Sequence, residues 1–213
     1  MKLYLIRHGE TYLNKYKRMQ GWSDSPLTEK GIEMAKQCGQ RLKEYPISHM
    51  ITTDLGRTIE TGRIIGSILN LTDKVRQMKA FRETFFGSFE GSFGNETWST
   101  VAKSAGFTSV IDFYQSSSIA EVMDYFHEVD STGDAEDYQA FISRIQDGLK
   151  QLEEQYGSDD HIVLVTHGNV IRNIAYLIDP TIDLAEELVN AGITILELTL
   201  EGRTLLSYNN NSI

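Results

Sequence analysis

Leu5-Ile6-Arg7-His8-Gly9-Glu10-Thr11 closes the first strand that the sequence predicts, and it places a cation and a histidine directly at the strand end. The strand predicted over residues 2–7 contains an unbroken apolar run, which is typical of a strand buried on both faces of a parallel sheet. In open α/β sheets, ligands bind beyond the carboxyl ends of the strands. We therefore expect Arg7 and His8 to face a ligand.

The order of strand followed by helix repeats along the chain. Helices are predicted from Thr28 towards Pro46 and over 57–69, 138–156 and 169–178, and strands over 49–53, 74–81, 162–165, 193–199 and 203–208. This alternation predicts an α/β fold with a mostly parallel central sheet, one antiparallel strand and helices on both faces.

Residues 82–136 interrupt this order with glycines, serines and many aromatic side chains. Only short helices are expected there, near 96–106 and 119–127. We interpret the segment as a lid-like insertion that covers the active-site end of the sheet, within a single domain that spans residues 1–213. Residues 92–138 contain nine Asp and Glu, one Lys and no Arg, so this region is acidic as well as aromatic.

The overall charge excludes some classes of partner. A formal net charge of −10 argues against binding to nucleic acid or to an anionic membrane, because both require clustered Lys and Arg. No apolar run approaches the roughly 18 residues of a membrane span, and the run at the N-terminus is too short for a signal peptide. We expect a cytoplasmic protein without a nucleic acid or membrane partner.

A second histidine occupies a position equivalent to that of His8. His167 directly follows the strand ending at Thr166, and Arg57 opens the helix that follows the second predicted strand. Each histidine is followed by a glycine, Gly9 or Gly168, which allows a backbone to approach a ligand closely. Two arginines and two histidines at one edge of a sheet predict a site for a phosphate group.

Phosphoryl transfer explains why these residue types occur together. The guanidinium fork of arginine matches the oxygens of a phosphoryl group, whose charge must be stabilised as it is transferred. Neutral imidazole is a competent nucleophile near pH 7, and nearby arginines disfavour its protonated form. One histidine can attack while the other donates to the phosphoryl oxygens. This chemistry requires neither a metal nor another cofactor, and we expect none.

Several segments resemble the histidine phosphatase superfamily, which includes cofactor-dependent phosphoglycerate mutases and small phosphatases. The resemblance rests on motifs in order along the chain, and it spans the chain apart from the insertion. They are Leu5-Ile6-Arg7-His8-Gly9-Glu10-Thr11 with Asn14, Gly21-Trp22-Ser23-Asp24-Ser25-Pro26-Leu27-Thr28, Thr53-Asp54-Leu55-Gly56-Arg57-Thr58-Ile59-Glu60-Thr61, Phe81-Arg82-Glu83-Thr84-Phe85-Phe86-Gly87-Ser88-Phe89-Glu90-Gly91 and Val165-Thr166-His167-Gly168. It implies a phosphoglycerate mutase-like fold.

The resemblance also implies roles for individual residues. His8 would be the nucleophile that becomes phosphorylated, and Arg7, Arg57 and His167 would bind the phosphate. Glu83 would protonate the leaving group and then activate water, although Glu90 and Glu10 remain alternatives for this acid. Additional phosphate contacts are expected from Asn14 and the Gly168 amide, with Ser23 and Thr11 as further candidates.

The sequence favours a phosphomonoesterase that acts on a small phosphorylated metabolite through phosphorylated His8. The acidic, aromatic insertion and the segment from Phe86 to Gly91, which looks like the phosphatase branch, support this hypothesis. A phosphoglycerate mutase is the alternative, but it must hold a small anionic intermediate and so needs a strongly cationic pocket. A non-catalytic module that binds phosphorylated ligands on the same fold is another. The natural substrate remains open, and either a monomer or a homodimer fits the sequence.

Overall fold

The computed structural model describes residues 1–199 and 201–210. Within them, one sheet of six strands has the spatial order β3-β2-β4-β1-β5-β6. The strands are β1 (Lys2–Arg7), β2 (His49–Thr52), β3 (Val75–Gln77), β4 (His161–Thr166), β5 (Ile193–Thr199) and β6 (Gly202–Asn210). Strands β1 to β4 are parallel, β5 is antiparallel to β1, and β6 reverses direction again. The predicted sheet, with one strand opposed to the others, is confirmed.

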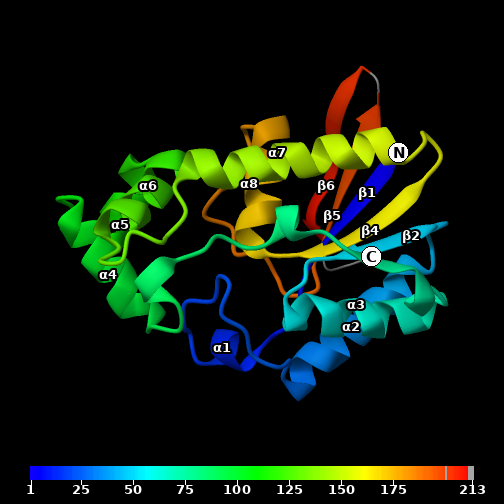
Figure 1. Ribbon diagram of the computed structural model, residues 1–213, viewed down its shortest axis with the longest axis horizontal. Helices are drawn as coiled ribbons and strands as arrows, with labels where there is room; N and C mark the ends of the chain where they lie inside the picture. The colour runs from blue at the N-terminus through cyan, green and yellow to red at the C-terminus, as the bar shows by residue number, and fades with distance from the viewer. Residues whose placement is uncertain (200, 211–213) are drawn as a thin grey trace.

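Helices cover both faces of this sheet (Figure 1). The α-helices are α1 (Tyr12–Lys15), α2 (Glu29–Leu42), α3 (Gly56–Leu69), α4 (Gly94–Ser104), α5 (Val110–Ser116), α6 (Ile119–Val129), α7 (Tyr138–Gln155) and α8 (Gly168–Ile178), and the short 3-10 helices are η1 (Thr72–Lys74), η2 (Lys79–Phe81) and η3 (Gly87–Phe89). One core cluster joins the sheet to α7 and α8, and a second joins its other face to α2 and α3. The result is the three-layer arrangement expected of an α/β fold.

Strand β1 shows why both faces are covered. Leu3 and Leu5 point into the cluster under α7 and α8, whereas Tyr4 and Ile6 point into the cluster under α2 and α3. All four side chains are almost fully buried. Alternate residues of a strand point to opposite faces, so an unbroken apolar run can be buried only between two layers of helices.

Helix boundaries follow local capping. The side-chain oxygen of Thr28 accepts a hydrogen bond from the Gly31 amide at 3.0 Å, so Thr28 is the predicted N-cap of α2. Asp137 caps α7 in the same way, through the Ala140 amide at 2.7 Å. Helix α3 ends at Leu69, and the next residue, Asn70, has a φ of 58°, the left-handed conformation that stops a helix.

Two predicted boundaries were wrong. The strand expected over 74–81 extends only from Val75 to Gln77, because the chain then turns into η2 and buries Phe81 beneath α7. Helix α2 ends at Leu42, well before Pro46. Helix α5 was not predicted, since it is seven residues long with one buried residue, Phe113, and so shows no helical periodicity.

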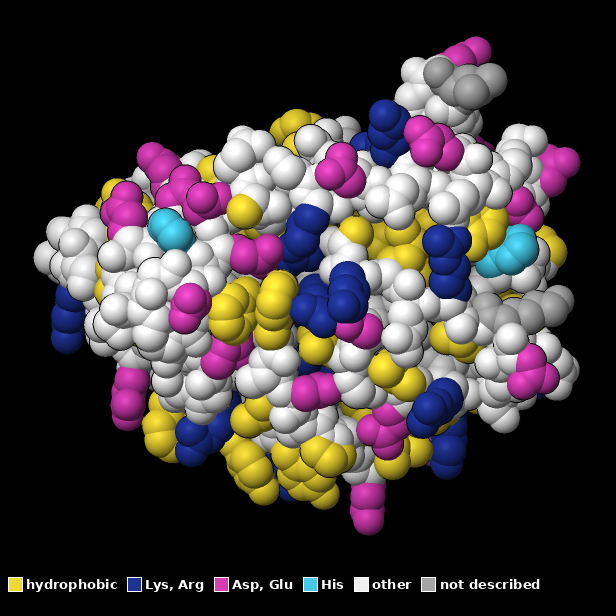
Figure 2. Space-filling view, viewed as in Figure 1, with side chains coloured by type: hydrophobic (Ala, Val, Ile, Leu, Met, Phe, Trp, Pro, Cys, Tyr) yellow, Lys and Arg dark blue, Asp and Glu magenta, His cyan; other side chains and the backbone are white. Residues whose placement is uncertain are grey.

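The insertion lies beyond the carboxyl ends of β1 and β4, where α4, α5 and α6 form a separate group (Figure 1, green). Its helices pack around their own core, which includes Val101, Phe113 and Phe126 together with Phe86 and Met19. Acidic side chains are spread over its outer surface (Figure 2). Among the described residues, no helix combines the length and apolar composition needed to cross a bilayer.

Candidate active site

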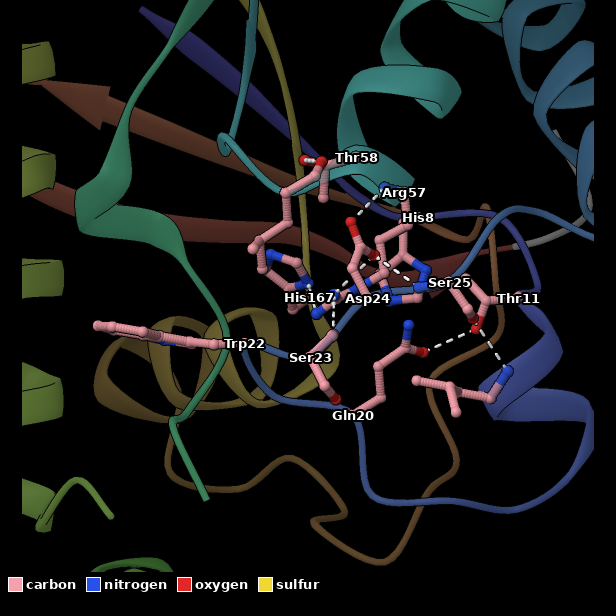
Figure 3. A network of polar contacts seen from close by, with 12 residues as sticks. His8, Thr11, Gln20, Trp22, Ser23, Asp24, Ser25, Arg57, Thr58 and His167 are labelled. Carbon is pink, nitrogen blue, oxygen red and sulfur yellow. Dashed lines mark hydrogen bonds and ion pairs between the residues drawn. The ribbon is translucent and has the colours of Figure 1, made fainter. Parts of the chain in front are cut away.

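The sheet register brings the two predicted histidines together. Arg7 pairs with Thr166 at the ends of β1 and β4, and the His8 amide donates to the Thr166 carbonyl at 3.0 Å. The rings of His8 and His167 therefore lie 5.4 Å apart between centroids, and both are buried (Figure 3). Residues 159 positions apart in the chain become neighbours because parallel strands end at the same edge.

The tautomer of His8 is fixed by the backbone. Its Nδ1 lies 2.9 Å from the Gly9 carbonyl oxygen, which can only accept, so Nδ1 must carry the proton. Burial lowers the pKa of His8 well below its usual value, and the charges of Arg57 and Arg7 lower it further. The ring is therefore neutral at pH 7, with a free electron pair on Nε2. That is the nitrogen available as a nucleophile.

His167 is held in the opposite tautomer. Its Nδ1 accepts from Arg57 Nη2 at 3.0 Å, so Nε2 carries the proton and donates to Thr53 Oγ1 at 3.0 Å. Thr53 in turn contacts Thr58 Oγ1 at 2.8 Å. Burial lowers the pKa of His167 well below its usual value, with Arg57 the next cause. Donation through Nδ1 to a phosphoryl group would require this nitrogen to gain a proton.

Arg57 is anchored by the loop that precedes α2. Nη2 donates to the Gly21 carbonyl at 2.6 Å, and Nη1 donates to the Ser23 carbonyl at 2.9 Å and to Asp24 Oδ1 at 3.1 Å (Figure 3). The side chain is completely buried, and this burial lowers its pKa although Asp24 opposes the change. A buried guanidinium with this many partners has a fixed orientation.

Four buried polar atoms in this region make no hydrogen bond with any residue that the structure describes. They are Arg7 Nε, Arg57 Nε, Ser23 Oγ and Gln20 Nε2. Arg7 itself is held by a hydrogen bond from Nη1 to the Leu188 carbonyl. Buried polar groups almost always have partners, so a cluster of unpaired donors is the composition expected where a polar anion binds.

Glu83 is buried next to the arginines. A methyl group built on Gly168 would lie 3.8 Å from Arg7 Nε and 3.9 Å from Glu83 Oε2, so these three residues converge. The carboxylate oxygens accept from the amides of Thr84 at 2.9 Å and Asn169 at 3.2 Å. Burial nevertheless raises the pKa of Glu83 above its usual value. A raised pKa makes the protonated form of this carboxyl more accessible, which is the form that a general acid requires.

The two alternative carboxylates are engaged elsewhere. Glu90 accepts from the amides of Gly21, Trp22 and Ser23 at 2.8–3.1 Å, and so closes the loop that anchors Arg57. Glu10 accepts from the Thr28 hydroxyl and pairs with Lys30 at 3.0 Å. The pKa of Glu10 is lowered, because its desolvation is outweighed by the hydrogen bonds from Thr28 and Lys30. The geometry favours Glu83.

The remaining predicted contacts differ in their surroundings. Asn14 forms a capping box with Thr11, whose amide donates to Asn14 Oδ1 at 3.2 Å. The Gly168 amide lies at the first position of α8, where helix amides lack intrahelical partners.

Gly9 was expected to let the backbone approach a ligand, but it has a different role. Its amide donates to Thr61 Oγ1 at 3.0 Å, and a Cβ on Gly9 would lie 2.6 Å from the Gly31 carbonyl oxygen. Gly9 is required by packing against α2.

Several residues that support the site were not predicted from the sequence. Asp24 and Thr53 both lie within the quoted motifs. The signal that could have identified them is a polar side chain in a motif: Asp24 contacts Arg57, and Thr53, directly after the second strand, contacts His167. Asn190 carries no such signal: its Nδ2 donates to the His8 carbonyl at 2.9 Å from 182 residues away. Within the described residues, no cluster of His, Cys, Asp and Glu is arranged to hold a metal ion.

Comparison with known proteins gives a consistent assignment. Over 65 residues the chain is 57% identical to a probable phosphoglycerate mutase, GpmB, from Cronobacter sakazakii (strain ATCC BAA-894), a match that spans only 30% of this chain and 30% of that relative. The crystal structure of phosphoglycerate mutase from Bacillus anthracis str. Sterne is similar with a TM-score of 0.93 and 34% identity, covering 99% of this chain and 93% of that one.

A variant of phosphoserine phosphatase from Entamoeba histolytica, solved in complex with phosphoserine, superposes with a TM-score of 0.69 at 25% identity, covering 98% of this chain and 96% of that one. The family model described as histidine phosphatase superfamily (branch 1) matches residues 3–211. With the paired histidines and arginines at the sheet edge, this match over nearly the whole chain shows that the protein belongs to the histidine phosphatase superfamily.

Proposed function

We propose that this protein is a phosphomonoesterase that hydrolyses a small phosphorylated metabolite through a phosphohistidine at His8. The observation that carries the proposal is the state of His8. The ring is buried and neutral, its Nδ1 proton is held by the Gly9 carbonyl, and Nε2 is left as a nucleophile beside two arginines. A structural histidine would not need this arrangement.

In the first step, the electron pair of His8 Nε2 forms a bond to phosphorus as the bond from phosphorus to the ester oxygen breaks. The leaving oxygen takes the proton of Glu83, so the alcohol departs neutral. Arg7 and Arg57 stabilise the phosphoryl oxygens, with Asn14 and the Gly168 amide as further donors. A substrate that binds as its monoanion brings one proton, which it shares with His167 Nδ1, and the released phosphate carries this proton away.

In the second step, the carboxylate of Glu83 removes a proton from water, and the water oxygen attacks phosphorus. The bond between phosphorus and His8 Nε2 breaks, inorganic phosphate is released, and Glu83 is protonated again for the next turnover. Every proton that leaves in the first step is restored in the second, so the protein returns to its starting state.

A phosphoglycerate mutase is the second candidate, because the relatives from Cronobacter sakazakii and Bacillus anthracis carry that name. The charge of the insertion disfavours it, since residues 92–138 offer one Lys and no Arg to a bisphosphorylated intermediate. Measuring phosphate release from several esters and the interconversion of phosphoglycerates on one sample separates the two candidates. Isomerisation much faster than phosphate release would refute the phosphomonoesterase.

His8→Ala provides the test of the intermediate. Brief incubation of the unchanged protein with a phosphate donor should add one phosphoryl group to His8, detected by mass spectrometry of acid-sensitive peptides. The variant should incorporate none and release no phosphate. If the unchanged protein neither labels nor hydrolyses any donor, a binding module on this fold becomes the better explanation.

A further inference from the structure

A largely enclosed cavity lies between the insertion and α8. Its walls are mainly apolar and aromatic, with Trp98 from α4, Tyr114 from α5 and Phe126 from α6. Helix α8 contributes Arg172 and Asn173. None of these side chains has a part in the phosphoryl-transfer steps above, so the cavity is a separate feature that adjoins the site.

Two residues connect the cavity to the proposed general acid. Thr84 and Asn169 both line it, and their backbone amides are the two donors that hold the carboxylate oxygens of Glu83, which does not itself line the cavity. Asn169 Nδ2 also donates to Thr84 Oγ1 at 3.2 Å, which joins the two residues into one wall. The wall formed by Thr84 and Asn169 therefore separates Glu83 from the cavity by a single layer of side chains, close enough for the alcohol part of an ester at Glu83 to reach it.

The size of the cavity suits one ring. The space open to the centre of a water molecule is about 70 Å³. A largely enclosed space with aromatic walls suits a single ring.

One charged side chain lines the cavity. Of the described residues that line it, Arg172 alone is charged. Its terminal nitrogens donate to Asn169 Oδ1 at 3.3 Å and to the Glu186 carbonyl at 3.2 Å, whereas its Nε makes no hydrogen bond with the described residues. Most of the remaining wall is apolar or aromatic, so the occupant is mostly apolar.

Asn173 adds one polar requirement. It is 1% exposed, and its Nδ2 donates to the Asn169 carbonyl at 2.8 Å. Because a carbonyl only accepts, the orientation of the amide is fixed and Oδ1 is the atom left free. Among residues 1–199 and 201–210, Oδ1 has no hydrogen-bond partner. A buried acceptor without a partner, on a residue that lines a cavity, calls for a donor on the occupant.

We propose that this cavity binds the alcohol part of the substrate, and that the substrate is a phosphate monoester of an alcohol with one apolar ring that carries a hydrogen-bond donor facing Asn173 Oδ1. The proposal rests on the phosphomonoesterase function proposed above and specifies its substrate class. The aromatic walls bind the ring, Asn173 selects the donor, and Thr84 and Asn169 direct the ester oxygen to Glu83.

The first test compares benzyl phosphate with ethyl phosphate, whose alcohols have similar basicity, so that general acid catalysis contributes equally. Burying the ring should raise kcat/KM for benzyl phosphate by about 100-fold or more, since even one methylene in an apolar pocket contributes about 10-fold. Equal values for the two esters would overturn the proposal.

A filled cavity should remove this preference. Ser117 lines the cavity, whereas its neighbour Ser116 is exposed and does not, so Ser117→Trp and Ser116→Trp form a matched pair. Ser117→Trp should lower kcat/KM for benzyl phosphate at least about 10-fold and leave ethyl phosphate unchanged, and Ser116→Trp should change neither. Equal losses on both esters in Ser117→Trp would contradict the proposal.

The Asn173 requirement is tested on the ligand side, because a substitution at this buried residue could disturb folding. Benzylphosphonates that carry a hydroxyl at each ring position are compared with the matching methoxy compounds, by calorimetry on the His8→Ala protein. At least one hydroxyl compound should bind about fivefold more tightly than its methoxy partner, the value of one hydrogen bond. No difference at any position would exclude the donor.

The two proposals fail differently. If neither ester nor p-nitrophenyl phosphate releases phosphate, the phosphomonoesterase function is refuted, whereas tight binding of benzylphosphonate over ethylphosphonate would still support the cavity as a ring site. If phosphate is released without a preference for the ring, the function stands and the assignment of the cavity is wrong.

Discussion

The two histidines illustrate how much a side chain depends on where it is buried. From the sequence, the arginines were expected to keep His8 neutral. In the structure, burial is the largest cause of the lowered pKa of both His8 and His167, and Arg57 comes second in each case. Desolvation penalises any charged form, and it acts here on a ring that the backbone has already oriented. The nucleophile is prepared by packing before the substrate arrives.

Glu83→Gln gives a prediction at the scale of a single residue. Glutamine keeps the shape but can accept from only one of the amides of Thr84 and Asn169, because its other terminal atom is an NH2 group, and it cannot donate the acidic proton. Alkyl phosphates, whose leaving alkoxide is basic, should lose about 100-fold or more in kcat/KM, and p-nitrophenyl phosphate much less. Steady-state kinetics on both esters check this. Equal losses of kcat/KM on both esters would show that another carboxylate is the general acid. Glu10→Gln is the comparison variant.

At the scale of elements, the docking of α2 depends on a glycine whose role is steric. A Cβ on Gly31 would lie 2.1 Å from the Glu10 carbonyl oxygen, in the loop that follows His8. Helix propensity alone would favour Gly31→Ala by about 1 kcal/mol. We expect instead a net destabilisation of about 1–3 kcal/mol, the usual cost of overpacking.

Denaturant unfolding measures this free energy. Lys36→Ala, at an exposed position of the same helix, is the control and should change stability by less than about 0.5 kcal/mol. A stabilised Gly31→Ala protein would mean that the loop carrying Glu10 moves freely with respect to α2.

The loop of residues 21–23 is held by one carboxylate. Glu90 accepts from three of its amides and from the Phe86 amide, while carbonyls of the same loop anchor Arg57. Glu90→Ala should lower the unfolding free energy by about 2–3 kcal/mol because it leaves several amides unpaired. It should also weaken binding of inorganic phosphate, which calorimetry measures.

Glu128→Ala, at an exposed position of α6, is the matched control for charge and should change neither quantity. Loss of stability with unchanged phosphate binding would show that Arg57 does not depend on this loop for its orientation.

At the scale of the whole molecule, the buried neutral histidines link folding to pH. The pKa values of His8 and His167 are lowered in the folded state relative to about 6.5 in the unfolded chain. Their contribution to stability is therefore fully present above pH 6.5 and is lost as pH falls below it. The raised pKa of Glu83 acts in the opposite sense, since its contribution is lost as pH rises through its folded pKa.

We expect the unfolding free energy to fall between pH 7.5 and 5.5 in phosphate-free buffer. The unfolding free energy of His8→Gln should fall by about 1 kcal/mol less than that of the unchanged protein over this interval. The variant has one histidine fewer to take up a proton in the unfolded state. Urea titrations at both pH values measure the difference. Identical slopes for the two proteins would show that His8 is accessible to protons in the folded state.

The order of elements could be predicted because it depends on local patterns. The apolar run before Arg7 requires a strand covered on both faces, and the 3,4-spaced apolar side chains of 138–156 require a helix, here α7. Short elements such as α5 escaped prediction, since seven residues carry too little periodicity to be distinguished from a loop.

The sequence by itself determined which chemical groups are present. Two histidines and one arginine lie at strand ends, a second arginine lies at the start of a helix, and an acidic, aromatic insertion accompanies them. Only the tertiary structure decided which nitrogen of His8 is free, which of three carboxylates is buried beside the arginines, and that Gly9 packs against α2. It also revealed an aromatic cavity whose wall includes Thr84 and Asn169. Tautomers, pKa values and cavities depend on distances between groups far apart in the chain, and those distances exist only after the sheet and the insertion have packed together.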